Sequence, residues 1–478
     1  MKFDVANLYP MLPEIFLASM ACLILILDLF LKKERRLVSY GLTQLTLMGA
    51  AALAAWVAAP HAQWAFDGSF VRDPMSDALK ICLFLITLMV FVYAKDYLKD
   101  RGLALGEFYV LGLFSVLGMC VMISAGNFLT IYLGLELLAL CMYALVAFDR
   151  KSSNGSEAAM KYFVLGALAS GILLYGISMV YGATGTIQLQ GVAKALTQRG
   201  VDDLVLVLGL VFIVIGLAFK FGAVPCHMWV PDVYQGAPTA VVSLLGSVPK
   251  IAAFALAMRL LVDGLAGLQA DWQGMLVILA ILSMAVGNLV AIAQTNIKRM
   301  LAYSTISHVG FIFLGILVGT KVGYGAAMFY AVVYALMAAG GFGMLILLSR
   351  QGFEAENLED FAGLNDRSPW FAAMMAVLMF SMAGVPPTVG FFAKFAVLEA
   401  AVNVHLVWLA VVGVAFSIIG AFYYIRIVKI LYFDKPTDNN PLTAGADVRV
   451  TLSINGLAVL WLGLFPASLL TLCQSAFI

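Results

Sequence analysis

The residues with the clearest chemical potential are charged side chains set inside long apolar stretches. Lys220 follows sixteen residues without an ionisable group, Lys250 stands near the middle of the next apolar segment, and Glu136 is the tenth residue of a 22-residue apolar span. A charge at the bilayer centre costs at least about 2.5–3.5 kcal/mol, so such side chains usually face a protein interior or a water-filled cavity. These three residues therefore predict a path for protons or another ion.

Glu136 and Lys220 are the pair that we expect to interact. Opposite charges in a low-dielectric interior attract strongly enough to compensate part of the cost of burying them. Two simpler interpretations remain open. Glu136 would be a structural acid bonded to a neighbouring helix, and Lys220 would lie at a helix end and extend its side chain to the membrane surface.

Two apolar segments, at 204–235 and 369–400, are interrupted by glycine and proline. The interrupting residues are Gly222, Pro225 and Pro231 in the first segment and Gly384, Pro386 and Pro387 in the second. A helix broken at membrane depth persists only where the freed backbone is buried or lines water. One such segment in each half is the signature of an inverted-repeat transporter with its sites at the breaks. Lys394 follows the second break, but no residue-level alignment of the two halves is available, because the first-half lysine precedes its proline.

Two histidines lie at the same depth. His227 is within the first break and His308 is inside the apolar span that begins near residue 301. Histidine relays protons near neutral pH. A lone histidine on an apolar helix is also often a hydrogen-bonded packing residue, so both a relay role and a packing role remain open.

The composition identifies the class of protein. Of 478 residues, 63% are hydrophobic and 12% are charged, whereas soluble domains carry about 25% charged residues. The net charge of +1 offers no basic face for nucleic acid, and the six cysteines have no metal-ligand spacing. The first apolar stretch, 11–31, has no small-residue cleavage site and is expected to stay as a helix. The chain is therefore predicted to be an integral membrane protein.

Segments of about 20 apolar residues, the length that crosses a bilayer, number about fourteen. They lie near 10–31, 37–58, 76–96, 107–125, 127–148, 158–182, 204–222 with a continuation to 235, 238–262, 272–294, 301–320, 323–349, 369–400, 404–432 and 448–476. Setting aside Lys220, Lys250 and Lys394 leaves 28 − 3 = 25 Lys and Arg, of which 18 fall in loops after odd-numbered spans, including the run at 32–36. The positive-inside rule then places both termini outside the cytoplasm.

We expect an all-α fold forming a single membrane domain over 1–478. Within it, 1–106 holds N-terminal helices, 107–262 and 272–432 form two inverted-topology repeats, each with a discontinuous helix, and 448–478 holds a C-terminal helix. The polar connections at 182–203 and 349–369 are expected to be solvated loops, although the second is also a candidate docking surface for a neighbouring subunit.

Three motifs carry a close family resemblance. FKFGAVPCHMWVPDVYQGAPT, QTNIKRMLAYSTISHVGF and MFSMAGVPPTVGFFAKF occur in this order, at 219–239, 294–311 and 379–395. Together they resemble the antiporter-like membrane subunits of the proton-translocating NADH:quinone oxidoreductase, respiratory complex I. The likeness covers the chain beyond its first two or three helices and is closest to the subunit N branch. Lys394 stands where the subunit M branch is expected to carry a glutamate, and no long lateral helix follows the fourteenth span.

The resemblance implies roles for particular residues. Glu136 and Lys220 would form the first-half pair, Lys250 the central relay and Lys394 the second-half proton site, with His308 as a secondary relay. The same superfamily includes multi-subunit Na⁺/H⁺ antiporters, and that alternative remains open.

The resemblance also implies what surrounds the chain. The chain has no Gly-rich nucleotide loop and no iron–sulfur or haem ligand pattern, so it would hold no redox centre itself. FMN, iron–sulfur clusters and quinone would belong to partner subunits. Its partners would be other membrane subunits of complex I, homologous antiporter-like subunits among them, together with protons, internal water and the lipid bilayer. The location implied is a bacterial inner membrane, with periplasmic termini.

Overall fold

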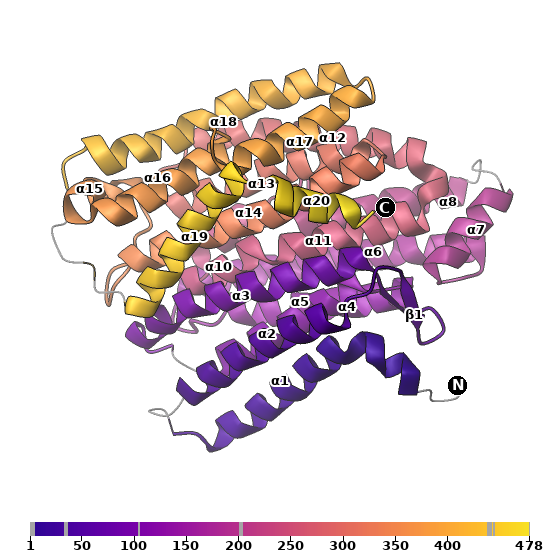
Figure 1. The fold of residues 1–478 in the computed structure, drawn as a ribbon, viewed down its shortest axis with the longest axis horizontal. Helices are drawn as coiled ribbons and strands as arrows, with labels where there is room; N and C mark the ends of the chain where they lie inside the picture. Colours follow the sequence, from indigo (N-terminus) through magenta and orange to yellow (C-terminus); the bar gives the residue numbers. More distant parts are fainter. Residues whose placement is uncertain are drawn as a thin grey trace.

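The computed structural model describes residues 5–32, 37–103, 106–199, 204–436, 442 and 445–477. Thirteen helices in these ranges are long and apolar enough to cross a bilayer, and the broken segment at 369–403 supplies one further crossing (Figure 1). Thirteen of the fourteen expected spans are thus confirmed by length and composition, and the remaining one, at 369–400, is present as two shorter helices. The only strands in the described ranges form a short hairpin, so the helical class is confirmed as well.

The elements follow the order that the sequence predicts. The N-terminal part comprises η1 (Val5–Met11), α1 (Leu12–Phe30), α2 (Leu37–Val57), the hairpin strands β1 (Gln63–Ala65) and β2 (Phe70–Arg72), and α3 (Pro74–Asp100). The first half comprises α4 (Gly106–Ile123), α5 (Phe128–Val146), α6 (Ser153–Thr184), α7 (Leu189–Arg199), α8 (Leu204–Phe221), α9 (Trp229–Gly236), α10 (Thr239–Ser247), α11 (Pro249–Ala257) and the π-helix η3 (Met258–Gly264).

The second half repeats this pattern of long and broken helices. It comprises η4 (Ala266–Leu268), α12 (Gln269–Ile292), α13 (Ile297–Leu317), α14 (Lys321–Leu348), η5 (Leu358–Phe361), α15 (Leu364–Arg367), α16 (Pro369–Ala383), α17 (Val389–Asn403) and α18 (Val407–Phe433). The last expected span is two helices, α19 (Ala446–Leu464) and α20 (Ala467–Ser475), because Pro466 cannot donate the hydrogen bond that would continue α19.

The two expected helix breaks are present, and the two broken helices run in opposite directions. The first broken helix is α8–α9 and the second is α16–α17. In Figure 1, α8 begins at the right end of the bundle beside α7, whereas α16 begins at the left end beside α15. Both termini lie toward the right end, as an even number of crossings requires. The opposite courses of the two breaks are those that inverted repeats would have.

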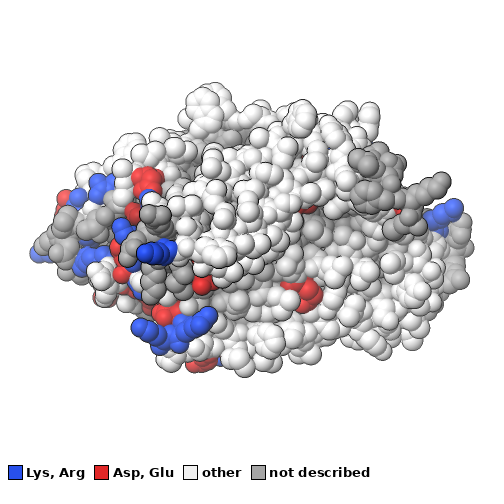
Figure 2. Space-filling view, turned by 90° about the horizontal axis from the view of Figure 1, so that it is seen from below, with Lys and Arg blue, Asp and Glu red and all other residues white. Residues whose placement is uncertain are grey.

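Charged side chains are concentrated at one end of the bundle. Figure 2 shows Lys, Arg, Asp and Glu gathered at the left end, while the broad middle of this face is almost free of charge. We call this the charged end. Of the basic run at 32–36, only Lys32 lies within the described residues.

The connection at 349–369 packs against the protein, so the prediction of a solvated loop was wrong. Leu364 is fully buried and Phe361 is 1% exposed. Glu354 forms an ion pair with Arg101 and accepts hydrogen bonds from the Tyr97 hydroxyl at 3.0 and 3.2 Å. The apolar residues of η5 and α15 are the buried ones, although the acidic residues of this connection suggested a solvated loop. The other polar connection, at 182–203, contains the helix α7.

Three cations outside the predicted site residues are buried and paired. Lys80 contacts Glu14 of α1 at 2.5 Å, and both side chains are at most 2% exposed. Arg72 binds Asp77 at 3.1 Å. Arg259 binds Asp73, at the start of α3, at 2.7 Å. Burial raises the pKa of Asp73, but the guanidinium group of Arg259 outweighs it and holds that pKa below its usual value.

Candidate functional site

The first break ends α8 with a Schellman motif. Gly222 has φ = +77°, its N–H donates to the Phe219 carbonyl at 3.0 Å, and the next N–H, of Ala223, donates to the Ala218 carbonyl at 2.8 Å. A Cβ at Gly222 would lie 2.6 Å from Val230, so this position has no room for a side chain. The turn leaves the carbonyl of Phe221, the last residue of α8, without a helical partner. Lys250 fills that role, because its Nζ donates to this oxygen at 2.7 Å.

The second break has the same construction. Gly384 has φ = +87° and donates to the Ser381 carbonyl at 3.0 Å, while Val385 donates to the Phe380 carbonyl at 2.9 Å. The free carbonyl belongs to Ala383, the last residue of α16, and Lys394 Nζ donates to it at 2.8 Å. In both halves, therefore, a lysine occupies the negative end of a half-helix dipole, where a cation is stabilised. We call Lys250 and Lys394 the capping lysines.

This common turn supplies the alignment that the sequence did not. Gly222 corresponds to Gly384, and the proline three residues later is Pro225 in the first half and Pro387 in the second. The two lysines come from different places, since Lys250 belongs to the helix that follows the break and Lys394 to the broken helix itself. The expectation that no residue-level alignment exists is therefore corrected at the turns, and the lysines correspond in their contacts.

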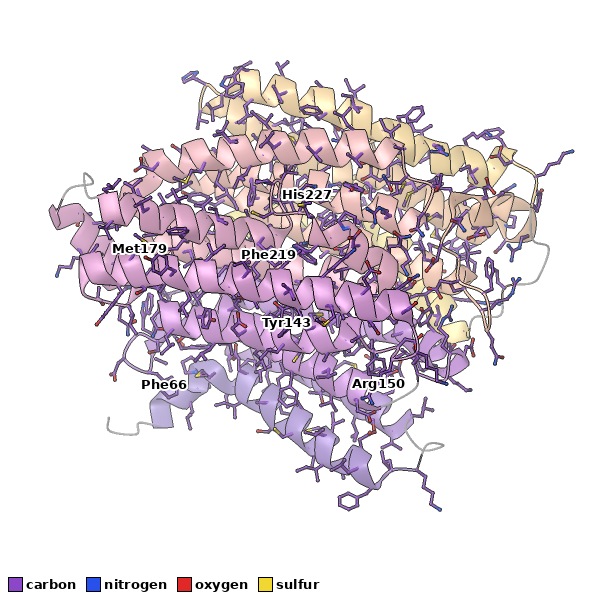
Figure 3. The ribbon with its side chains drawn as sticks, turned by 180° about the vertical axis from the view of Figure 1, so that it is seen from behind. Phe66, Tyr143, Arg150, Met179, Phe219 and His227 are labelled. Carbon is purple, nitrogen blue, oxygen red and sulfur yellow. The ribbon has the colours of Figure 1, made fainter. Side chains whose placement is uncertain are left out.

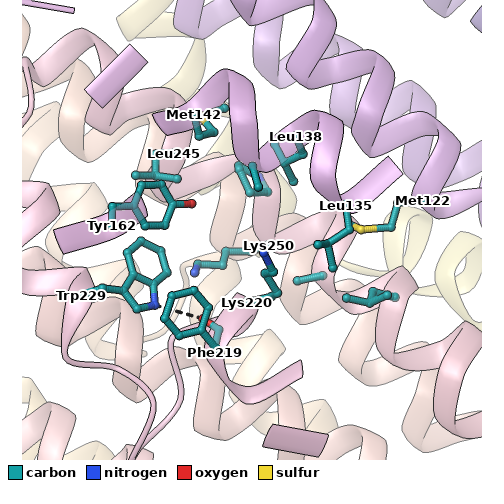
Figure 4. Close-up of a pocket in the computed structure, with 14 residues that line it drawn as sticks. Met122, Leu135, Leu138, Met142, Tyr162, Phe219, Lys220, Trp229, Leu245 and Lys250 are labelled. Carbon is teal, nitrogen blue, oxygen red and sulfur yellow. Dashed lines mark hydrogen bonds between the residues drawn. The ribbon is translucent and has the colours of Figure 1, made fainter. Parts of the chain in front are cut away.

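Lys220 and Lys250 line one cavity between α4, α5, α6, α8, α9 and the α10–α11 span, which we call the lysine cavity (Figure 4). Its volume of about 30 Å³ is room for about two water molecules. The other lining residues are Met122, Leu135, Leu138, Ala139, Met142, Tyr162, Phe219, Trp229, Leu245, Pro249, Ala253 and Leu256. Lys220 Nζ donates to the Ser170 hydroxyl of α6 at 3.2 Å. The site thus places two lysines around a small space that admits water.

Close packing of α6 on α8 positions Lys220. Gly176 of α6 and Gly209 of α8 lie where the helices touch, and a Cβ at Gly176 would be 2.7 Å from the Gly209 carbonyl. Small residues let helix backbones approach closely in membranes. This contact brings the last turn of α8 to Ser170, which lies about 1.7 turns before Gly176 on α6. Figure 3 shows Phe219, the neighbour of Lys220, midway along the bundle.

Glu136 does not form the ion pair that we expected. Within the described residues, no carboxylate of Glu136 approaches a lysine nitrogen within 4.0 Å, and its Oε1 is buried without a hydrogen-bond partner. The direct pairing was wrong because the spacing of residues in two spans does not fix which faces of those helices meet.

His308 is held in a cluster of hydroxyl groups that the sequence did not reveal. Its Nδ1 is 2.7 Å from the Tyr330 hydroxyl and its Nε2 is 3.0 Å from the Tyr424 hydroxyl. Tyr334 donates to Thr305 at 2.7 Å and to the Gly246 carbonyl at 3.3 Å. We call His308, Tyr330, Tyr334 and Tyr424 the tyrosine–histidine cluster; each is at most 3% exposed. Tyrosines at helical spacing usually pack in a core. Only the fold, which places these tyrosines beside His308, distinguishes them from ordinary core residues.

The cluster lies between the capping lysines. Gly246 is four residues before Lys250, so the Tyr334 hydroxyl reaches the same face of that span one turn away. On the other side, Lys394 Nζ is 5.3 Å from the centre of the Phe311 ring, which stacks on Tyr330 with centroids 5.7 Å apart. Lys394 also donates to the Ser417 hydroxyl at 2.9 Å. The cluster on α13, α14 and α18 thus lies between the two breaks, and the apolar ring of Phe311 separates it from Lys394.

His227 lies outside this arrangement. It is half-buried in the loop of the first break, its ring is 6.5 Å from that of Tyr303, and its Nδ1 has no hydrogen-bond partner in the described part of the chain. His227 does not line the lysine cavity. Of the predicted site residues, the structure therefore brings Lys220 and Lys250 to one cavity. It places His308 beside Tyr330, which stacks on the Phe311 ring next to Lys394.

A substitution tests the cluster. His308→Asn should slow proton movement through the chain about tenfold or more, since a positioned proton-transfer group contributes about 10²–10⁴-fold. Tyr330→Phe and Tyr424→Phe should each have a smaller effect, because each removes one hydroxyl and leaves the imidazole in place. The measurement is the proton gradient formed per substrate turned over in membrane vesicles. His61→Asn, on an exposed histidine, is the matched control; equal gradients in the two histidine variants would contradict a relay through His308.

Comparisons with known proteins agree over nearly the whole chain. Residues 125–420 match the family model described as NADH:quinone oxidoreductase/Mrp antiporter, TM. The NADH-quinone oxidoreductase subunit N of Thioalkalivibrio sulfidiphilus is 60% identical over 477 residues, covering 100% of this chain and 99% of the relative. A chain of respiratory complex I from Thermus thermophilus is 30% identical with a TM-score of 0.82, covering 96% of this chain and 98% of that one. A chain of the Mrp complex from Dietzia sp. has a TM-score of 0.85 at 22% identity, covering 99% and 97%, which is likeness of fold.

Proposed function

The chain belongs to the NADH:quinone oxidoreductase/Mrp antiporter membrane family, and from this membership we propose that it is a proton-translocating membrane subunit of an NADH:quinone oxidoreductase, respiratory complex I. The observation that carries the proposal is the pair of capping lysines. Each is buried at membrane depth and bound to the open end of a broken helix. Buried cations at helix breaks are expensive to retain without a role in moving charge.

The residues present support a proton path. Lys220 and Lys250 both line the lysine cavity, which has room for water. Tyr334 bonds the Gly246 carbonyl in the Lys250 span and packs against His308, which bonds Tyr330; the Phe311 ring then separates Tyr330 from Lys394. Glu136, whose Oε1 is buried without a hydrogen-bond partner, would act on Lys220 through its charge without a direct ion pair. His227 would take part only if water extended the path into the first break.

We propose that residues 107–262 and 272–432 are inverted repeats, flanked by the N-terminal helices of 1–106 and the C-terminal helices of 448–478. Their support is the matching Schellman turn in each broken helix and the opposite courses of α8 and α16 (Figure 1). Sites at the breaks of inverted repeats are the arrangement expected of a transporter that alternates its access.

The redox chemistry is assigned to other subunits. In the described ranges, no group of three or more His, Cys, Asp or Glu side chains is arranged to hold a metal ion. FMN, iron–sulfur clusters and quinone would be held by partners, and electron transfer there would drive proton movement here. Homologous antiporter-like subunits would be its neighbours in a bacterial inner membrane, with the charged end in the cytoplasm and the termini in the periplasm.

An Mrp-type cation/proton antiporter subunit is the second candidate, because that fold fits equally well. The identity of the relatives does not favour it. Subunit N proteins match from end to end at 52–60% identity, against 22% for the Mrp chain.

The testing experiment is purification through a tag at the C-terminus. In mild detergent from native membranes, the tagged chain should bring down NADH:quinone activity with flavin and iron–sulfur absorbance. A small assembly without NADH oxidation, which catalyses Na⁺-dependent proton exchange in vesicles, would instead establish the antiporter.

A further inference from the structure

A second cavity lies at the charged end of the bundle, and its lining is polar. Its volume is about 280 Å³, and we call it the polar cavity. The lining residues are Ser152, Asn154, Glu157, Ala158, Lys161, Asp232, Gln235, Gly236 and Glu356. Asp232 is held from two sides, by Lys161 and by Arg299, each at 2.8 Å. The space is large enough and polar enough to hold water continuous with the surface.

The polar cavity and the lysine cavity are one helical turn apart on two different helices. On α6, Ala158 lines the polar cavity and Tyr162, four residues later, lines the lysine cavity. On α9, Asp232 lines the polar cavity and Trp229, three residues earlier, lines the lysine cavity. The two cavities therefore share a wall, and Tyr162 and Trp229 are the side chains that face inward from it.

Tyr162 and Trp229 form a stack. Their ring centroids are 4.6 Å apart with an interplanar angle of 17°, and the two side chains are 8% and 3% exposed. The indole N–H of Trp229 donates to the Phe219 carbonyl at 3.1 Å, which ties the stack to the last turn of α8 beside Lys220. The Trp229 ring also faces Lys250, with Nζ 5.9 Å from its centroid. The Trp229 ring is thus part of the wall and also faces Lys250.

The lining of the lysine cavity contains few other polar side chains. Apart from its two lysines and Trp229, whose N–H is already bonded, the side-chain polar group of its lining is the Tyr162 hydroxyl. Figure 4 shows this hydroxyl pointing into the cavity, among the side chains of methionine and leucine residues. A proton reaching Lys220 or Lys250 from the polar cavity would pass the stack and meet this hydroxyl first.

Resting on the proposed function, we propose that the polar cavity is the proton-uptake site for Lys220 and Lys250, and that the Tyr162–Trp229 stack is the wall that controls water between them. Closed, the stack keeps the lysines from equilibrating freely with the charged end. A small displacement of α9 or of either ring joins the two bodies of water. Tyr162 and Trp229 act by controlling access, and neither needs to carry the proton.

The test measures access directly, in the assembled complex in inverted vesicles, whose cytoplasmic face is outward. Ala253→Cys places a thiol in the lysine cavity, and a membrane-impermeant methanethiosulfonate reagent reports whether water reaches it. Protein without this substitution supplies the background from the six native cysteines. Labelling of the new thiol should be slow, and adding Trp229→Ala or Tyr162→Ala should speed it about tenfold or more. Tyr162→Phe, which keeps the stacked ring, should leave it slow.

Tyr175→Ala is the matched control, since Tyr175 is on the same helix but is 60% exposed. Three results would contradict the proposal that the stack controls access. They are fast labelling with the stack intact, unchanged labelling in both alanine variants, and equal acceleration by Tyr175→Ala. NADH oxidation by the same vesicles shows that the variants assemble. Because labelling does not require proton pumping, loss of the wall and loss of the proposed function would be distinguished: a chain that purifies without NADH activity can still show a controlled cavity, and an active complex can lack one.

Discussion

Replacing either capping lysine with methionine should abolish proton movement through this chain while leaving the complex assembled. Methionine matches the length of lysine and stays apolar, so the span keeps its packing. What is lost is a proton carrier, and positioned proton-transfer groups contribute about 10²–10⁴-fold. For Lys250→Met and Lys394→Met, the initial rate of proton uptake by inverted vesicles, divided by the rate of NADH oxidation, should therefore fall.

Arginine variants separate charge from proton transfer. Lys250→Arg and Lys394→Arg keep a cation that can bond the Phe221 or Ala383 carbonyl, but arginine does not give up its proton in proteins. If the lysines relay protons, arginine should be as defective as methionine; if they only fix the helix break by their charge, arginine should restore pumping. Lys429→Met removes a lysine whose side chain is 60% exposed and should change nothing. Unchanged pumping in both methionine variants would show that the path runs elsewhere.

The sequence predicts the elements well because membrane spans are encoded locally. Length, hydropathy and the Gly/Pro interruptions place the thirteen apolar spans and both breaks, since each depends only on a contiguous stretch. The identity of the capping lysines also follows from the sequence, because a cation inside an apolar stretch is conspicuous wherever it points.

The contacts were not predictable in the same way. Glu136 and Lys220 are both conspicuous, yet they do not pair, because rotation of α5 about its axis decides what Glu136 faces. The correspondence of Lys250 with Lys394 emerges only when both are seen to bond the last carbonyl of a half-helix. Tyr330 and Tyr334 carry no signal among 18 tyrosines until the fold places them beside His308.

Lys80 is a buried charge that its position in the sequence does not reveal. It lies seven residues into α3, near enough to the helix start to resemble a surface lysine, while Glu14 lies similarly near the start of α1. Packing of the N-terminal helices buries both and joins them at 2.5 Å. The Phe70 ring covers Lys80, with Nζ 5.1 Å from its centroid. An ion pair this deep has either a structural or a charge-transfer role, and stability and pumping measured together separate the two.

Lys80→Met should destabilise the assembled chain by about 3–5 kcal/mol, because it leaves the buried carboxyl group of Glu14 without its partner. Replacing both partners by neutral residues of similar shape often costs little, so the double variant Glu14→Gln/Lys80→Met should recover most of the loss. The measurement is the thermal unfolding midpoint and yield of the complex across the four members of a double-mutant cycle, from which the coupling energy follows.

The pumping ratio of the double variant then decides the role of the pair. A stable double variant that pumps normally would mean that Glu14 and Lys80 only hold α1 against α3. A stable double variant with a lowered ratio would place a second charge-transfer site in the N-terminal helices. Equal stability of Lys80→Met and the unmodified chain would contradict the buried ion pair itself, since an unpaired carboxylate 2% exposed within the bundle cannot be cost-free.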